Sequence, residues 1–453
     1  MSAPASPLIT KMRATELAPA IALLLLVQAP CRAFVEHAAR GTVRRTGTRI
    51  AAEEGGSPDE EVVCGHPSDL FPEKIMDGVK FNLFGAGRAA DEDRRHGSFQ
   101  PPPRSMEGTT VLITGASSGL GLESARRLAL GGATVVLTAR TQAKVHRAVN
   151  DAVEYCRDPE RGQYVNASPK VVGITLDLDD FSTVRSFPER YRSSMSDRSL
   201  ASQIDVLMNN AGGGGHPTRE VTVDGFEKTF QSNHLGHFLL TSLLFENDLA
   251  TRDGRGCTVI NVSSITHRCA EATHSAHGEE RKEAEFGYDF DNMNCDIAYS
   301  GEAYCQAKLA NVLFTRELQR RADLHKSGWL TAVSLEPGGV ATDIWRHVLG
   351  YDPRTFDKRC RSGEELTQPP NRGFIDKLSA RLFYRIATQV QRGANVQIWL
   401  AYLHASEQKA IEKGQHYDEF RTVRPVPKYV NESNSERLWT LSEDMAGIKF
   451  GFD

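Results

Sequence analysis

From Thr109 onward, short apolar runs rich in β-branched residues alternate with helical stretches, and this alternation constrains the fold more than any other feature of the chain. The first three strand-like runs are TVLIT, ATVVLTAR and KVVGITLDL. Strands separated by helices of ten or more residues form parallel sheets through right-handed crossovers. We therefore predict an α/β fold with a doubly wound parallel sheet of the Rossmann type, in a single domain over residues 108–453.

The segment TGASSGLG at 114–121 joins the first predicted strand to the first predicted helix. Glycine permits a tight turn and lets main-chain N–H groups approach a ligand closely. A helix that begins at such a turn presents unsatisfied N–H groups and the positive end of its dipole, which suits a pyrophosphate. The segment thus predicts a dinucleotide site; a purely structural turn is the alternative. The expected contacts are Gly115, Ser117, Ser118, Gly119, Leu120 and Gly121.

Polar residues also follow the other predicted strands, at the carboxyl ends where doubly wound sheets bind ligands. The expected cofactor contacts there are Asp177, Leu178, Asn210, Ala211, Gly212, Pro337, Gly338 and Thr342. After the second strand, an acid would bind the ribose 2′-OH of NAD, but this chain has Arg140, which suits a 2′-phosphate. We therefore expect NADPH in preference to NAD; a solvated arginine at a helix start is the alternative.

Tyr304 and Lys308 lie four residues apart in a helical stretch, so their side chains share one face. A nearby ammonium lowers the pKa of a tyrosine from about 10 toward the working range. Tyr304 would then be a general acid/base. The hydroxyl of Ser264 would donate a hydrogen bond to a carbonyl oxygen as it gains negative charge. Taken singly, all three residue types are also ordinary structural residues in such places.

Together these motifs resemble the short-chain dehydrogenase/reductase superfamily over about residues 109–449. The matching segments are the glycine turn, Asp177-Leu178, NNAG at 209–212, Asn233 in SNHLGHF, Ser264, and YCQAK at 304–308. The resemblance implies an enzyme that transfers hydride between a nicotinamide and a carbonyl or alcohol. It implies Asn233, Ser264, Tyr304 and Lys308 as catalytic residues, with Asn233 holding a water chain to Lys308. Tyr304 and Lys308 would also contact the cofactor.

Within the superfamily, NHLGHFLLT, EPGGVATDIWRH and ERLWTLSEDMAGI are similar to the branch of retinol dehydrogenases, plastid inner-envelope dehydrogenases and light-dependent protochlorophyllide reductases. The branch implies an apolar carbonyl or alcohol substrate that is retinoid-, carotenoid- or lipid-like. A light-dependent pigment reductase is an alternative, although Ala310 and Gly339 stand where those reductases commonly carry cysteines. An NADPH-sensing plastid interaction protein is another; the intact Ser264, Tyr304 and Lys308 argue against a purely binding role.

The N-terminus predicts targeting rather than fold. Residues 1–33 have a basic start, an apolar stretch too short to span a bilayer and small residues before a cleavage point, the layout of a signal peptide. Residues 34–50 have the arginine-rich, acid-poor composition of a transit peptide. This order resembles the two-part targeting sequence of algae with secondary plastids, so we expect a plastid protein; the secretory pathway or ER is the alternative. Residues 51–107 predict a disordered linker.

Composition excludes some classes of function. The formal net charge of −4 gives no basic footprint for nucleic acid. The eight cysteines are scattered without a C-x-x-C pair, which predicts reduced thiols and neither a disulfide framework nor a zinc site. The histidines of the 266–298 insertion lack ligand spacing, so we predict no metal and a solvated insertion beside the site.

Three further segments are left with structural expectations. His234 and His237 are expected to pack or cap on a helix, and Gly212–Gly215 to form a flexible loop. The apolar face over 374–386 is compatible with a cover for a lipophilic substrate, with peripheral membrane association, or with ordinary core packing. The sequence does not indicate an oligomeric state.

Overall fold

The structure, a computed structural model, describes residues 98–214, 216, 218–274, 280–299, 302–340, 390–407 and 410–452. Its central sheet has seven parallel strands in the order β3-β2-β1-β4-β5-β8-β9. The predicted doubly wound sheet is confirmed. The strands are β1 Thr110–Ile113, β2 Thr134–Ala139, β3 Lys170–Thr175, β4 Val206–Asn209, β5 Cys257–Val262, β8 Leu330–Leu335 and β9 His416–Tyr417.

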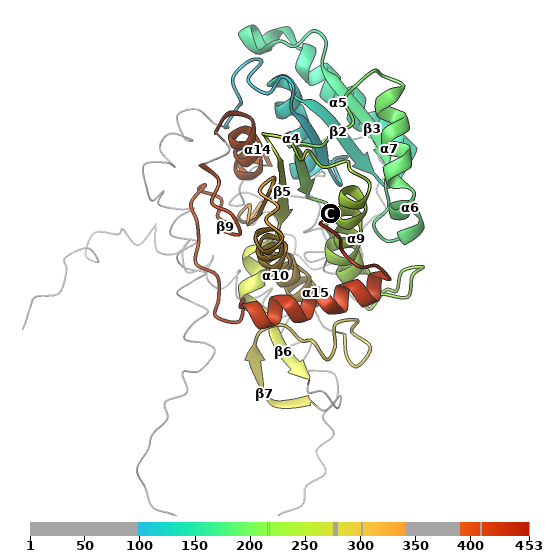
Figure 1. Cartoon of the computed structure of the whole chain (residues 1–453), viewed down its shortest axis with the longest axis vertical. Coiled ribbons are helices and arrows are strands. Elements are labelled where there is room, and N and C mark those ends of the chain that lie inside the picture. The colour runs from blue at the N-terminus through green and yellow to red at the C-terminus, as the bar shows by residue number, and fades with distance from the viewer. Residues whose placement is uncertain are drawn as a thin grey trace, which may run out of the picture. The chain divides into compact units, whose positions relative to one another are not determined.

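Helices separate successive strands, as the alternation predicts. They are α4 Gly119–Leu130, α5 Gln142–Arg157, α6 Phe181–Arg185, α7 Phe187–Ser196, α8 Lys228–Phe230, α9 Gly236–Glu246, α10 Glu302–Leu324, α13 Val390–Gly393, α14 Asn395–Glu407 and α15 Glu432–Ala446. A π-helical turn over Gln231–Leu235 precedes α9, and 3-10 turns occupy Pro159–Tyr164 and Ile265–Cys269. A short hairpin, β6 Glu271–His274 and β7 Glu280–Phe286, lies away from the main sheet (Figure 1).

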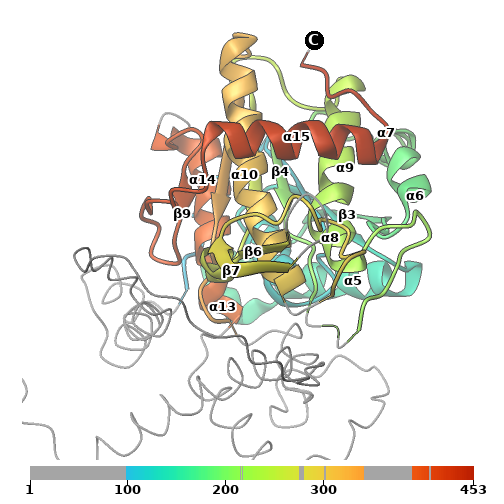
Figure 2. The same ribbon diagram turned by 90° about the horizontal axis from the view of Figure 1, so that it is seen from below.

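The sheet is buried on both faces, because its strands alternate side chains between two apolar cores. In β1, Val111 and Ile113 contribute to the core under α4, α5 and α14, whereas Leu112 contributes to the core under α7, α9 and α10. Helix α15 runs across the outer side of α10 and α9 (Figure 2). Because the strands are parallel, the loops that follow them all lie at the same edge of the sheet.

Two expectations about chain organisation need correction. The last ten residues of the predicted linker belong to the folded domain: Met106 is fully buried, and the Phe99 N–H donates to the Asn395 side chain at 2.9 Å. Phe99 finds its partners on α14, almost three hundred residues later in the chain, and Met106 packs at the end of α4 beside Gly131, which composition does not reveal. The predicted signal peptide, the transit-like segment and most of the linker lie outside the described residues.

The 266–298 insertion is not simply solvated. His267, Ala270 and Tyr288 are at most 5% exposed, and the Asn294 side chain accepts a hydrogen bond from the Glu227 N–H at 2.6 Å. Both described ends of the insertion therefore pack on the domain. Its acidic composition concealed the few apolar residues that anchor it.

Candidate active site

The glycine turn after β1, residues 114–121, forms the glycine cradle, in which Gly115 and Gly121 have no room for a side chain. A Cβ on Gly115 would lie 2.7 Å from Ala211, and one on Gly121 would lie 2.6 Å from the Asn210 amide. Helix α4 begins here with Ser118 as its N-cap, without a side-chain cap and without an acid in its first turn. The positive end of α4 is thus left to a ligand, so the turn fits a dinucleotide pyrophosphate.

Thr114 fixes this turn to the loop after β4. Its buried Oγ1 accepts hydrogen bonds from the N–H groups of Asn210 and Ala211, at 3.0 and 2.9 Å. The same oxygen lies 2.8 Å from Nε2 of His237, whose Nδ1 is 3.0 Å from the Asn233 carbonyl. A carbonyl only accepts, so His237 Nδ1 carries the proton and Nε2 accepts from the Thr114 hydroxyl. Burial lowers the pKa of His237 to about 4, which keeps the ring neutral.

This network is not predicted from the sequence. His237 is expected there to pack or cap on a helix, whereas in the structure its ring joins the glycine turn to Asn233, a predicted catalytic residue. The i, i+4 spacing of Asn233 and His237 is the signal that could have indicated it. His234 does pack as predicted: it is buried, and its Nε2 lies 2.9 Å from the Ser442 hydroxyl.

Asn233 and Lys308 meet beside Gly212. The Asn233 amide donates to the carbonyls of Gly213 and Thr229, and its buried Oδ1 has no partner in the part of the chain that the structure describes. Asn233 Oδ1 and Lys308 Nζ lie 2.5 and 3.0 Å from the point where a Gly212 Cβ would stand. Both polar groups therefore face one small space that only a glycine leaves open. An acceptor and a donor placed in this way suit a bridging water, as the resemblance implies.

Tyr304, Ser264 and Lys308 converge on one point from α10 and the end of β5. Tyr304 makes a hydrogen bond with the Ser264 hydroxyl, and Lys308 Nζ lies 5.6 Å from the Tyr304 ring centroid. Lys308 Nζ also donates to the Val262 carbonyl at 3.2 Å. Burial lowers the pKa of Lys308 to about 8.

The expected direction of the Tyr304 pKa is wrong. Burial raises the pKa of Tyr304 above its usual value of 10, and the hydrogen bond with Ser264 opposes this only in part. The largest cause is the removal of water around the phenol oxygen, which disfavours the charged phenolate. Tyr304 is therefore protonated at neutral pH, ready to donate a proton rather than accept one.

The predicted flexible glycine loop has a different role. A side chain on Gly214 would collide with the Tyr304 ring, so this glycine is required by close approach. Tyr299, the other nearby tyrosine, donates its hydroxyl to the His216 carbonyl at 3.0 Å. Gly215 lies outside the described residues.

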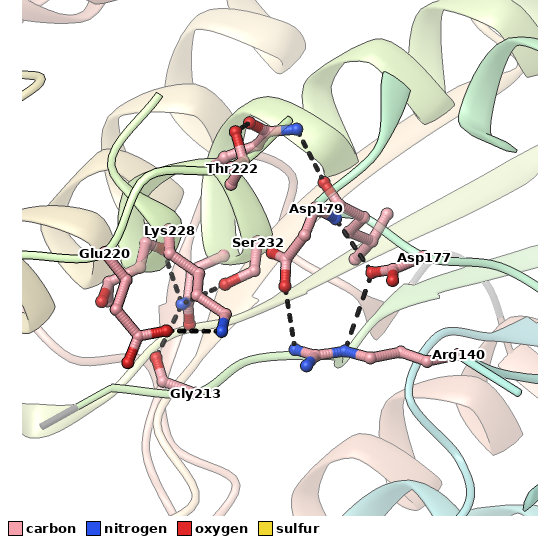
Figure 3. Close-up of polar contacts among 12 residues, drawn as sticks. Arg140, Asp177, Asp179, Gly213, Glu220, Thr222, Lys228 and Ser232 are labelled. Carbon is pink, nitrogen blue, oxygen red and sulfur yellow. Dashed lines mark hydrogen bonds and ion pairs between the residues drawn. The ribbon is translucent and has the colours of Figure 1, made fainter. Parts of the chain in front are cut away.

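Arg140 lies at the far side of this edge, after β2. Its guanidinium forms ion pairs with Asp177 at 3.7 Å and Asp179 at 3.4 Å, and its side chain is 53% exposed (Figure 3). The arginine is thus neither simply solvated nor buried. Asp179 was not predicted as a site residue, and its place two residues after Asp177 at a strand end is the signal that could have found it.

The other predicted contacts are placed as follows. Leu178 is buried and packs against Gly236. Pro337 and Gly338 follow β8, and Gly338 has a φ of +77°, with the Glu419 carboxylate filling the place of a Cβ. Thr342 and the apolar face over 374–386 lie outside the described residues.

The chain resembles known proteins over most of its folded part. Residues 109–278 match the family model described as short chain dehydrogenase. Human retinol dehydrogenase 13 is 31% identical over 78% of this chain and 89% of its own length, and human retinol dehydrogenase 12 is 31% identical over 76% and 88%.

Solved structures also match. A protein from Mycobacterium paratuberculosis is 27% identical over 78% of this chain and 99% of its own, with a TM-score of 0.49. With the parallel sheet, the glycine turn and the retinol dehydrogenase relatives established, the chain belongs to the short-chain dehydrogenase family, whose members are NAD(P)-dependent oxidoreductases of alcohols and carbonyls.

Proposed function

We propose that this oxidoreductase uses NADPH to reduce the carbonyl of an apolar substrate, with Tyr304 as the proton donor. The observation that carries the proposal is the convergence of a protonated Tyr304, Ser264 and buried Lys308 beside the glycine cradle. The cradle leaves the N-terminus of α4 free for a pyrophosphate. When bound there, the nicotinamide supplies the hydride.

The chain's own residues supply the proton and stabilise charge. As the carbonyl oxygen gains negative charge, the hydroxyls of Ser264 and Tyr304 donate hydrogen bonds to it, and the Tyr304 proton is transferred. Lys308 stabilises the resulting phenolate, and its buried ammonium lies close enough to do so. The space shared by Asn233 Oδ1 and Lys308 Nζ admits a water that returns a proton to the site.

Arg140 is the basis for proposing NADPH. No acid follows β2 directly, and the guanidinium is exposed enough to contact a 2′-phosphate. Its two acidic partners lie at 3.4 and 3.7 Å, distances typical of loose pairs that an arriving phosphate can replace.

The relatives named retinol dehydrogenase support an apolar substrate of the retinoid, carotenoid or lipid class. The test is a dark assay of the purified protein with NADPH or NADH over matched apolar and polar aldehydes and ketones. We expect turnover with NADPH and an apolar aldehyde. Turnover only under illumination with a tetrapyrrole pigment would favour the light-dependent alternative, and NADPH binding without turnover of any compound would favour the sensing alternative.

We further propose delivery to a plastid, from the signal-like and transit-like segments of the sequence. A fluorescent fusion of residues 1–60 should enter the plastid, and Phe34→Ala should leave it in the outer compartments. Secretion of the unaltered fusion would contradict this. Among the described residues, no helix has the length and apolarity to cross a membrane.

A further inference from the structure

Three buried side chains meet where His267 follows β5, Glu336 follows β8 and His416 begins β9. His267, Glu336 and His416 are 0%, 7% and 1% exposed. One ring nitrogen from each histidine and a carboxylate oxygen of Glu336 all lie within 4.8 Å of one another. The three residues come from distant parts of the chain, so no ligand spacing in the sequence could reveal them.

His267 presents an unused base. Its Nδ1 lies 2.6 Å from the Ser264 carbonyl, and because a carbonyl only accepts, Nδ1 carries the proton. Nδ1 also lies 3.9 Å from Glu336 Oε2, and with the proton on Nδ1 the lone pair of the ring is on Nε2. This Nε2 is buried, and no group of the described residues makes a hydrogen bond with it. A buried acceptor left in this state destabilises the fold unless a ligand binds it.

His416 and Glu336 place two further bases together. His416 Nε2 lies 3.4 Å from Glu336 Oε2, and His416 Nδ1 lies 2.9 Å from the Ser334 hydroxyl. When Nδ1 donates to Ser334, Nε2 turns a lone pair toward the carboxylate. Two lone pairs that face each other at this distance repel, and a cation between them, either a proton or a metal ion, removes the repulsion.

We propose that His267, Glu336 and His416 form a divalent-cation site, with Zn²⁺ as the metal that suits it best. Two imidazoles and one carboxylate are a donor set that zinc takes in proteins. Each imidazole also has its Nδ1 held by a second group, Ser264 or Ser334, which is the usual support for a histidine ligand. The site would tie the two-residue edge strand β9 to β5 and β8, next to Ser264.

The test is a Zn²⁺ titration of the full chain after chelator treatment, followed by calorimetry and by the melting temperature. We expect one zinc per chain and a higher melting temperature with zinc. Glu336→Gln and His416→Gln should each weaken zinc binding by more than about 100-fold, since loss of an outer-shell partner alone costs about 10–100-fold. His404→Gln is the matched control, because His404 is also buried with an unpartnered Nε2 but lies outside the cluster.

Two results would overturn the proposal. No zinc uptake by the wild type would show that a proton alone holds Glu336 and His416 together. Equal zinc binding by wild type and Glu336→Gln would place the metal on exposed histidines. Circular dichroism of the metal-free variants shows whether they fold; if neither does, Co²⁺ added to the wild type decides, because a buried site of this kind gives intense visible absorption and surface histidines do not.

Discussion

The two sides of the candidate site differ in how firmly their side chains are held. On the buried side, short hydrogen bonds or close contacts fix the side chains of Thr114, Asn233, His237, Tyr304 and Lys308. On the exposed side, Arg140 faces two carboxylates at 3.4 and 3.7 Å and keeps half of its side chain in solvent. Buried hydrogen bonds cannot be replaced by water, whereas exposed ion pairs contribute little and exchange readily. The buried side therefore holds the geometry for chemistry, and the exposed side is free to select a cofactor.

The largest expected effect on the buried side concerns the proton donor. Tyr304→Phe removes the transferable proton but keeps the ring against Gly214, so folding and NADPH binding should survive. Dark turnover should fall by about 10²–10⁴-fold, the usual contribution of a positioned general acid. Steady-state kinetics on the best substrate measure it. Tyr299→Phe is the control and should change turnover little; wild-type turnover by Tyr304→Phe would refute the role.

Thr114→Val tests whether the buried network is structural. The isosteric change removes the Oγ1 acceptor of the Ala211 N–H and the donor to His237, while the Asn210 N–H keeps the Met208 carbonyl at 2.9 Å. The free energy of unfolding in urea should fall by about 2–4 kcal/mol. Thr440→Val is the control, because this exposed threonine bonds only within its own helix and should be near neutral. A neutral Thr114→Val would mean that the loop finds other partners.

Lys308→Met should stabilise the protein at neutral pH while it abolishes activity. The pKa of Lys308 falls from 10.5 in the unfolded chain to about 8 in the fold, so burial of the ammonium costs on the order of 3 kcal/mol below pH 8. From pH 8 to 10.5 the unfolded chain binds more protons, so the wild type gains stability as pH rises and the advantage of Lys308→Met shrinks. Urea unfolding at pH 7 and pH 10 measures both. If Lys308→Met raised the free energy of unfolding equally at pH 7 and pH 10, the charge argument would be contradicted. Exposed Lys449→Met is the control.

Arg140→Ala tests the exposed side. NADPH binding should weaken by roughly 1.5–3 kcal/mol, as for a hydrogen bond to a charged group, while NADH binding changes little. Fluorescence titration with both cofactors measures the difference. Arg198→Ala, an exposed arginine that bonds the Ser194 carbonyl, should affect neither cofactor. Equal losses for NADPH and NADH would remove the basis for a 2′-phosphate contact.

Asp179, the second carboxylate beside Arg140, should have the smallest effect on cofactor binding. Asp179→Asn removes one carboxylate that competes for Arg140, so NADPH should bind about two- to five-fold more tightly, the size of a partly exposed ion pair. NADH affinity should stay constant. Weaker NADPH binding in this variant would mean that Asp179 holds Arg140 in position instead of competing for it.

The local sequence pattern was sufficient to predict those structural features that depend on residues within one segment of the chain. The alternation of strands and helices predicted the parallel sheet, and the glycine turn predicted the cradle, because both depend on neighbouring residues. The pattern failed for Phe99, whose partners follow much later in the chain, and for Gly214, which is required by a tyrosine ninety residues away.

By itself, the sequence determined the order of the elements and the identity of the groups at the ends of the strands, since periodicity and glycine chemistry are local properties. Tertiary structure alone decided the protonation of these groups. Burial raises the pKa of Tyr304 and lowers that of Lys308, and the fold brings together His267, Glu336 and His416. The physical reason is that the energy of a charge depends on the water removed around it and on atoms brought near it in space, and neither is fixed until the chain has folded.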